Sequence, residues 1–129
     1  MAHRGPVRQW DLFDADLDFP VGSEQGGNPR PVIVVSNDGF NGAFPVITVV
    51  PLTKREGKKR KIYAFEIVIP ARLAGNPLES IIMPYQIRTI AKDRLLQRVG
   101  RLEDAGVRGQ IEDRIIEHIG IDLDDDAGA

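Results

Sequence analysis

Gly22-Ser23-Glu24-Gln25-Gly26-Gly27-Asn28-Pro29-Arg30-Pro31 runs directly into Val32-Ile33-Val34-Val35, and this stretch decides how the chain is interpreted. Glycine allows positive φ and the close approach of another backbone, so the first half predicts a tight loop. The unbroken Val/Ile run predicts a strand over residues 31–35 that is buried on both faces. Arg30 lies between loop and strand, flanked by prolines that fix φ and favour extended geometry. A planar guanidinium on so restricted a base suits recognition of a phosphate.

Short apolar runs elsewhere predict a mainly β chain. We expect strands over residues 10–17, 31–35, 46–50 and 62–69, short strands over 80–83 and 87–90 separated by a break at Pro84, and one more over 99–102. Residues 37–42 are predicted to form a turn, and residues 71–78 a connector. Several short strands and one terminal helix favour a small curled barrel or sandwich.

The C-terminal part of the sequence has a helical period. Apolar side chains recur every four residues, at Val107, Ile111, Ile115 and Ile119, with Ile116 widening the stripe. Asp104 is the expected N-cap and Gly120 the expected C-terminal cap. His118 lies beside the stripe, where a structural role is more common than a catalytic one. Residues 122–129 are acidic and poor in apolar side chains, which predicts a disordered tail.

The composition restricts the classes of protein. A chain of 129 residues with 42% hydrophobic side chains is expected to form one compact domain. It contains no cysteine, which excludes disulfides and thiolate metal sites. No apolar run approaches the ~20 residues of a membrane span. The polar start is not typical of a secretory signal, so we expect a cytoplasmic protein that does not engage a membrane.

The net charge of −2 conceals two segments of opposite sign. Aspartates dominate the tail after residue 121, whereas basic side chains crowd one segment, at Lys54, Arg55, Lys58, Lys59, Arg60 and Lys61. Such a run is commonly a solvated hairpin tip. It can also form a positive wall for a nucleic-acid backbone, which gives affinity without sequence choice.

Three blocks of the sequence together resemble the MazF/PemK family of toxin endoribonucleases. The first is the Gly-Ser-Glu-Gln loop with Arg30-Pro31 and Ser36-Asn37-Asp38, the second is Val49–Thr53, and the third is Gln86–Leu95 followed by Gly100-Arg101-Leu102. The resemblance covers about residues 9–121, leaving 1–8 as an N-terminal extension and 122–129 as the tail. It implies an SH3-like small barrel of the MazF/CcdB type, with a C-terminal helix, that pairs as a homodimer.

The resemblance also implies a function and its chemistry. The chain would be the toxin of a toxin–antitoxin system, cutting single-stranded RNA at selected sequences without a metal or other cofactor. Attack by the RNA's own 2′-hydroxyl would leave a 2′,3′-cyclic phosphate and a 5′-hydroxyl. Arg30 would stabilise the phosphoryl transition state, and Thr53 would position the reacting phosphate or its nucleophile.

Further side chains are expected to bind the RNA. They are Glu24 and Gln25 in the loop, Lys54, Arg55, Lys58 and Lys59 in the basic segment, and Tyr85, Gln86 and Arg88 in the third block. Gln86 and Arg88 would share one face if this block is a strand. Many relatives carry an acidic residue where this chain has Tyr85, and a tyrosine there could instead stack on a base or donate a proton.

Two other functions remain open at this level. CcdB-like toxins of related fold poison DNA gyrase without chemistry of their own, and a degenerate toxin would bind RNA without cutting it. The positions of Arg30 and Thr53 favour the nuclease. A toxin of this kind implies a cognate MazE-like antitoxin whose acidic or amphipathic tail competes with RNA for the basic surface.

Overall fold

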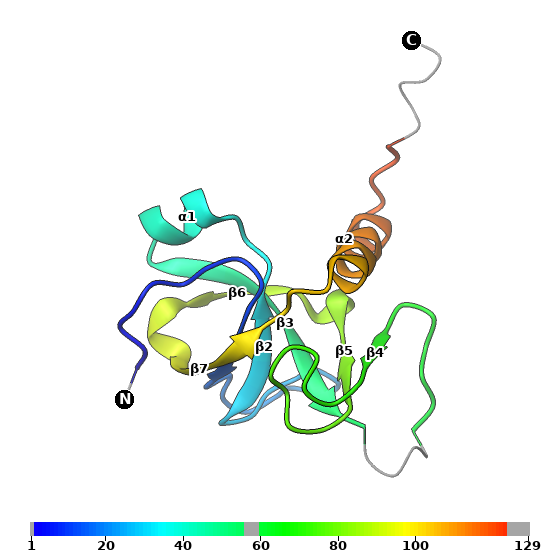
Figure 1. Ribbon diagram of the computed structural model, residues 1–129, viewed down its shortest axis with the longest axis horizontal. Coiled ribbons are helices and arrows are strands. Elements are labelled where there is room, and N and C mark those ends of the chain that lie inside the picture. Colours follow the sequence, from blue (N-terminus) through cyan, green and yellow to red (C-terminus); the bar gives the residue numbers. More distant parts are fainter. Residues whose placement is uncertain (1, 56–59, 124–129) are drawn as a thin grey trace.

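The computed structural model describes residues 2–55 and 60–123. The elements follow in the order β1 (Asp11–Ala15), β2 (Arg30–Val34), α1 (Asp38–Ala43), β3 (Val46–Lys54), β4 (Ile67–Ile69), β5 (Ser80–Ile82), the 3-10 turn η1 (Pro84–Gln86), β6 (Arg88–Ala91), the 3-10 turn η2 (Lys92–Arg94), β7 (Leu95–Arg101) and α2 (Ala105–Ile119). Figure 1 shows a curled sheet with α2 against one side of it. The predicted mainly β fold with a C-terminal helix is confirmed.

The sheet is antiparallel and runs in the order β4-β5-β3-β2-β1-β7, with β6 also paired to β3. The long strand β3 pairs with β6 along its first half and with β5 at its far end. The predicted break at Pro84 is confirmed, because Pro84 starts η1 between β5 and β6. This turn allows two consecutive strands to pair with β3.

Two apolar clusters lie on opposite faces of the central strands. Val32 and Val34 of β2 point into a cluster with Phe13, Ile47 and Leu95, which the strands β1, β2, β3, β6 and β7 surround as a small barrel. Ile33 points to the other face, into a second cluster that β4, β5 and α2 cover. All three β2 side chains are fully buried, which confirms the two-sided burial predicted from the Val/Ile run.

The helix α2 has the predicted caps. Asp104 Oδ1 accepts a hydrogen bond from the Val107 N–H at 2.9 Å, and Gly120 adopts φ of 76° at the C-terminal cap. Ile111 is fully buried, but Ile119 is 58% exposed. The expectation that Ile119 continues the buried stripe is therefore wrong, because the last turn lies beyond the cluster that receives Ile111.

Two sequence expectations need correction. Residues 37–42 do not form a simple turn, because the Asn37 side chain accepts from the Phe40 N–H at 2.8 Å and caps the short helix α1. The strand expected over 62–69 is reduced to β4, because Tyr63 and Glu66 close a turn before it through a 2.9 Å backbone hydrogen bond. Strands β3 and β7 are longer than predicted. None of the helices in the described part of the chain is long and apolar enough to cross a membrane.

Two glycines allow the connector 71–78 to lie against β7. Gly75 has φ of +94°, and a Cβ added to Gly100 would lie 2.2 Å from the Ala74 carbonyl oxygen. No side chain fits between these backbones without moving one of them. The contact therefore fixes the connector, which forms one wall of the cavity described below.

Gly100→Ala should lower the free energy of unfolding by about 2–3 kcal/mol, since the methyl group must push two backbones apart. The measurement is urea denaturation followed by circular dichroism. Gly109→Ala is the matched control, because nothing lies within 4 Å of a Cβ at that position of α2. There the same substitution should raise stability by about 0.5–1 kcal/mol. Equal effects of the two substitutions would contradict the proposed close packing.

Candidate active site

A cavity of about 740 Å³ opens where the loop 22–29, the start of β2, the end of β3 and the connector 71–78 meet. Its described lining consists of Leu12, Asp14, Gln25, Pro29, Arg30, Pro31, Thr53, Lys54, Arg60, Asn76, Pro77, Leu78, Ser80 and Val99. The cavity thus combines cations, two hydroxyl groups and one carboxylate with apolar side chains. Both residues predicted to be catalytic, Arg30 and Thr53, line it.

Arg30 is held in place from the loop side. Its Nε donates to the Gly26 carbonyl oxygen at 2.8 Å, and Nη1 lies 3.5 Å from the Leu52 carbonyl oxygen. Gly26 itself is pressed against the chain, because a Cβ there would lie 2.6 Å from the Asp18 carbonyl oxygen. The loop glycines were predicted to allow close approach and positive φ, and Gly26 and Gly27, with φ of 118°, confirm both. The guanidinium is therefore preorganised at the cavity wall.

Thr53 and Lys54 bring the end of β3 into the cavity. Thr53 is half-buried and stands opposite Ile81 of β5, so its backbone is fixed by the sheet. Lys54 follows it, exposed, and lines the same cavity. A hydroxyl group and an ammonium group beside Arg30 suit a phosphodiester, which offers oxygen acceptors and negative charge.

The loop residues Glu24 and Gln25 have separate positions. Gln25 lines the cavity, whereas Glu24 Oε1 accepts the Val21 N–H at 2.9 Å and closes the loop on itself. Gln86 also acts on this loop, since its Nε2 donates to the Ser23 carbonyl oxygen at 3.0 Å. Because Gln86 belongs to η1 and Arg88 to β6, the expected common strand face is wrong.

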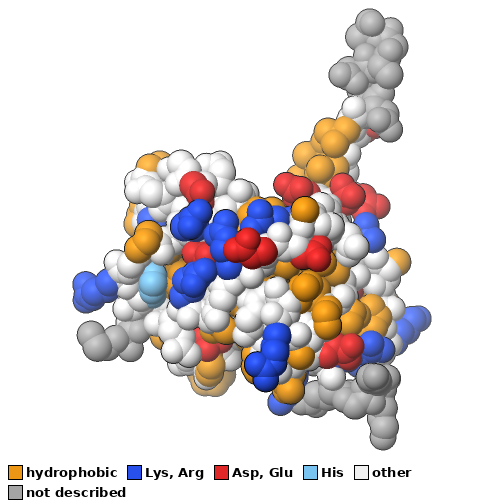
Figure 2. Space-filling view, in the orientation of Figure 1, with side chains coloured by type: hydrophobic (Ala, Val, Ile, Leu, Met, Phe, Trp, Pro, Cys, Tyr) orange, Lys and Arg blue, Asp and Glu red, His pale blue; other side chains and the backbone are white. Residues whose placement is uncertain are grey.

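The remaining predicted RNA-binding residues lie outside the cavity or outside the described residues. Arg55 forms an ion pair with Glu79 at 3.7 Å, and Arg88 is exposed on β6 opposite Val49. Lys58 and Lys59 fall outside the described residues. Figure 2 shows lysine and arginine side chains interleaved with acidic ones on the viewed face, so no single sign of charge covers it.

Tyr85 lies in a different place from Arg30 and Thr53. It borders a separate cavity of about 520 Å³ beside α2, with Phe65 and His118. Its hydroxyl donates to Glu66 Oε2 at 2.7 Å, and its ring meets Phe65 edge-on. Burial and the hydrogen bond to the Glu66 carboxylate raise the pKa of Tyr85 to about 12. The structure therefore does not bring Tyr85 to the cavity as a proton donor.

Arg60 is a cavity residue that the predicted site omitted. Its two Nη atoms each bond one oxygen of the Glu66 carboxylate at 2.8 Å, a paired geometry that orients the guanidinium. The Glu66 side chain is fully buried while that of Arg60 is 36% exposed, so Arg60 is the solvent-accessible partner of the pair. The sequence shows both residues, but nothing local indicates that they pair.

Comparison with known proteins identifies the family. A family model described as "PemK-like, MazF-like toxin of type II toxin-antitoxin system" matches residues 8–119. The chain belongs to this toxin family. Endoribonuclease MazF9 of Mycobacterium tuberculosis is 35% identical over 118 residues, which cover 88% of this chain and 96% of that protein. Endoribonuclease EndoA of Bacillus subtilis is 36% identical over 117 residues, covering 91% and 94%. The predicted family is confirmed.

Solved structures of the family share the fold. MazF from Deinococcus radiodurans (Form-I) superimposes with a TM-score of 0.73 at 22% identity, covering 92% of this chain and all of the other. A structure titled "Endoribonuclease in complex with its cognate antitoxin from Mycobacterial species" superimposes with a TM-score of 0.70 at 18% identity, covering 91% and 98%. The predicted MazF-type fold is therefore confirmed.

The toxin fold gains stability from ionised Glu66, and this gives a pH dependence. Burial raises the pKa of the Glu66 carboxyl, but hydrogen bonds from Arg60, Tyr85 and the Tyr63 N–H outweigh burial and lower it from 4.5 to about 2. Since the folded-state pKa is depressed, the stabilisation is present above pH 4.5 and is lost as pH falls toward 2. The group thus contributes to stability at neutral pH.

Glu66→Gln should lower the free energy of unfolding at pH 7 by about 2–3 kcal/mol, because Arg60 loses its ionic partner and the buried network is broken. The deficit relative to wild type should shrink below pH 4.5. Denaturation curves at several pH values measure both effects. Glu117→Gln is the control, since its pair with Arg114 is exposed and should contribute less than about 1 kcal/mol. A pH-independent deficit would contradict the assignment to Glu66 ionisation.

Proposed function

We propose that this chain is the toxin of a toxin–antitoxin pair and an endoribonuclease that cuts single-stranded RNA at selected sequences. The printed names of Endoribonuclease MazF9 and Endoribonuclease EndoA agree with this activity. The observation that carries the proposal for this chain is the convergence of Arg30 and Thr53 on one cavity, with Arg30 fixed by the Gly26 carbonyl group. A fixed guanidinium beside a hydroxyl group suits stabilisation of a phosphoryl transition state.

The proposed reaction is internal attack without a metal. The 2′-hydroxyl oxygen attacks the adjacent phosphorus, the bond to the 5′-oxygen breaks, and the products end in a 2′,3′-cyclic phosphate and a 5′-hydroxyl. Arg30 neutralises charge that develops on the phosphoryl oxygens, and Thr53 donates a hydrogen bond that orients them.

The proposal includes partners and place of action. Single-stranded RNA would enter along Gln25, Lys54 and Arg60, which give the cavity polar and cationic walls. A MazE-like antitoxin would compete with RNA for this surface. A structural neighbour of the chain was solved in complex with its cognate antitoxin, which supports a partner of this kind. A homodimer and a cytoplasmic location remain predictions. Sedimentation of the purified chain, alone and with antitoxin, measures how many subunits the toxin and its complex contain.

The test is cleavage of a long, unstructured RNA in EDTA, with the ends mapped. Wild type should make defined cuts with 5′-hydroxyl ends. Arg30→Ala should lower kcat/KM at least about 100-fold, because the transition-state charge loses its cation, and Thr53→Ala about 10-fold or more. Arg8→Ala and Thr89→Ala serve as matched controls, since both residues are exposed and neither lines the cavity.

Other results would point elsewhere. Intact RNA with folded wild type would overturn the nuclease proposal and direct attention to gyrase binding. RNA retained on the protein in a gel shift, but uncut, would identify a degenerate toxin. Equal activity of wild type and Arg30→Ala would overturn the assigned role of Arg30 alone.

A further inference from the structure

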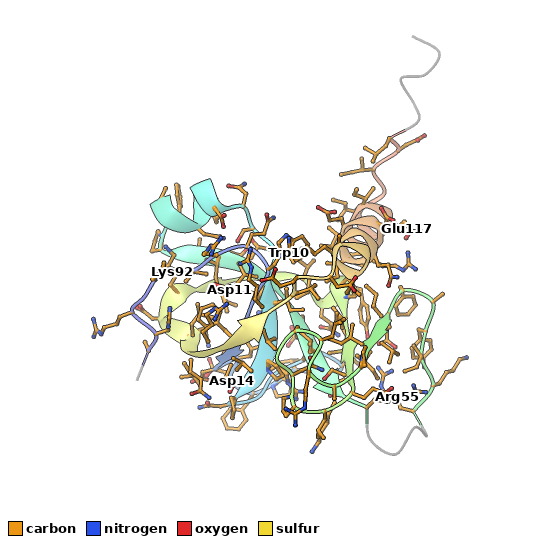
Figure 3. All side chains as sticks on the ribbon, viewed as in Figure 1. Trp10, Asp11, Asp14, Arg55, Lys92 and Glu117 are labelled. Carbon is orange, nitrogen blue, oxygen red and sulfur yellow. The ribbon has the colours of Figure 1, made fainter. Side chains whose placement is uncertain are left out.

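Asp14 is the one carboxylate among the described residues that line the Arg30 cavity, and no histidine joins it there. It lies on β1 opposite Pro31 of β2, one register position from the pairing of Ala15 with Arg30. In Figure 3 Asp14 lies toward the lower side of the molecule, below β7 and away from α2. Attack by a 2′-hydroxyl needs a group that takes its proton, and a carboxylate in reach of the substrate can do this.

Other acidic and phenolic side chains of the region are committed elsewhere. Glu24 Oε1 accepts the Val21 N–H, and Asp18 pairs with Arg94 at 2.6 Å. Glu66 is held by Arg60, and Tyr85 donates to Glu66. None of these four lines the Arg30 cavity. Asp14 therefore remains as the candidate base within the described lining.

The surroundings of Asp14 suit a role between two nucleotides. A second hollow of about 300 Å³, lined by Asp14, Pro29, Leu96 and Gln97, lies beside the main cavity. Asp14 and Pro29 border both hollows, so an RNA strand that occupies both must pass Asp14. Gln97 of β7 donates its Nε2 to Asp14 Oδ2 at 3.2 Å and orients the carboxylate.

We propose that Asp14 is the general base of the RNA cleavage reaction, taking the proton of the attacking 2′-hydroxyl group. This rests on the proposed function and adds a catalytic residue to it. As the 2′-oxygen bonds to phosphorus, its proton moves to the Asp14 carboxylate. The bond from phosphorus to the 5′-oxygen breaks, and that oxygen takes a proton from water. The resulting hydroxide removes the proton from Asp14 and restores the carboxylate.

Among the described residues, the other charged side chains that line the cavity are cations: Arg30 of β2, Lys54 of β3 and Arg60 before β4. On β7, the neutral Gln97 contacts Asp14, and the neighbouring Arg98 pairs with Asp11 at 3.2 Å. The cations bind the phosphate, and the carboxylate acts on the ribose hydroxyl, so the two tasks fall on opposite charges. The rate should fall on the acid side of the pH profile as the carboxylate is protonated.

The experiment measures kcat and KM for wild type and Asp14→Asn from acid to alkaline pH in EDTA, with melting curves as a check on folding. Asp14→Asn should lower kcat at least about 100-fold at neutral pH, remove the acid limb of the profile and leave KM nearly unchanged. Binding of an RNA that carries 2′-O-methyl groups and resists cleavage should also stay unchanged. Asp113→Asn, on the exposed face of α2, is the matched control and should behave as wild type.

The outcomes separate this proposal from the proposed function. If wild type cuts RNA and Asp14→Asn keeps kcat with the same acid limb, Asp14 is not the base. If binding of the methylated RNA falls as much as kcat/KM while the acid limb persists, Asp14 only holds RNA and the proposal is overturned. If folded wild type does not cut RNA, the proposed function fails, and the assignment of Asp14 fails with it.

Discussion

Burial of β2 and β3 on both faces is the constraint on which the rest of the structure depends. Val32 and Val34 fill the barrel, and Ile33 packs in the cluster that α2 covers, so these three residues of β2 divide between two cores. A shift of register by one residue would turn Val32 and Val34 toward the α2 side and Ile33 into the barrel. The shapes and volumes of the two cores oppose this exchange. The register of this strand therefore fixes where β2 begins and where β3 ends. Arg30 is the first residue of β2 and Thr53 is the last but one of β3, so core packing sets the positions of both.

The site combines this rigid sheet with a loop that is held close to it by backbone hydrogen bonds. The Leu17 N–H donates to the Gly27 carbonyl oxygen and the Gly27 N–H to the Asp18 carbonyl oxygen, both at 2.8 Å, and these bonds tie the loop to the segment that follows β1. Gly26 then presents its carbonyl group to Arg30. Functional side chains are commonly carried by loops on a rigid scaffold. Here the loop also restricts a side chain of the scaffold, since Arg30 belongs to β2.

The sequence predicts features that depend on neighbouring residues. The buried strand β2, the Asp104 and Gly120 caps and the break at Pro84 follow from local patterns, and the structure has them. Arg30 and Thr53 were found through the family resemblance, since a lone threonine at a strand end carries little signal. The network around Glu66 could not be predicted, because it joins residues separated by 6 and 19 positions. The place of Asp14 in the cavity cannot be predicted for the same reason, because it depends on sheet register.

The tyrosine at position 85 connects fold stability with the location of acid–base chemistry. An acidic side chain there would bring a second negative charge against the buried Glu66 carboxylate, and like charges in such a place repel strongly. The phenol instead donates a hydrogen bond, which helps keep Glu66 ionised beside Arg60. That arrangement holds Arg60 in place at the Arg30 cavity. It leaves Tyr85 with a raised pKa and outside the lining of that cavity. Proton transfer in the proposed reaction must then come from the cavity itself, where β1 supplies Asp14.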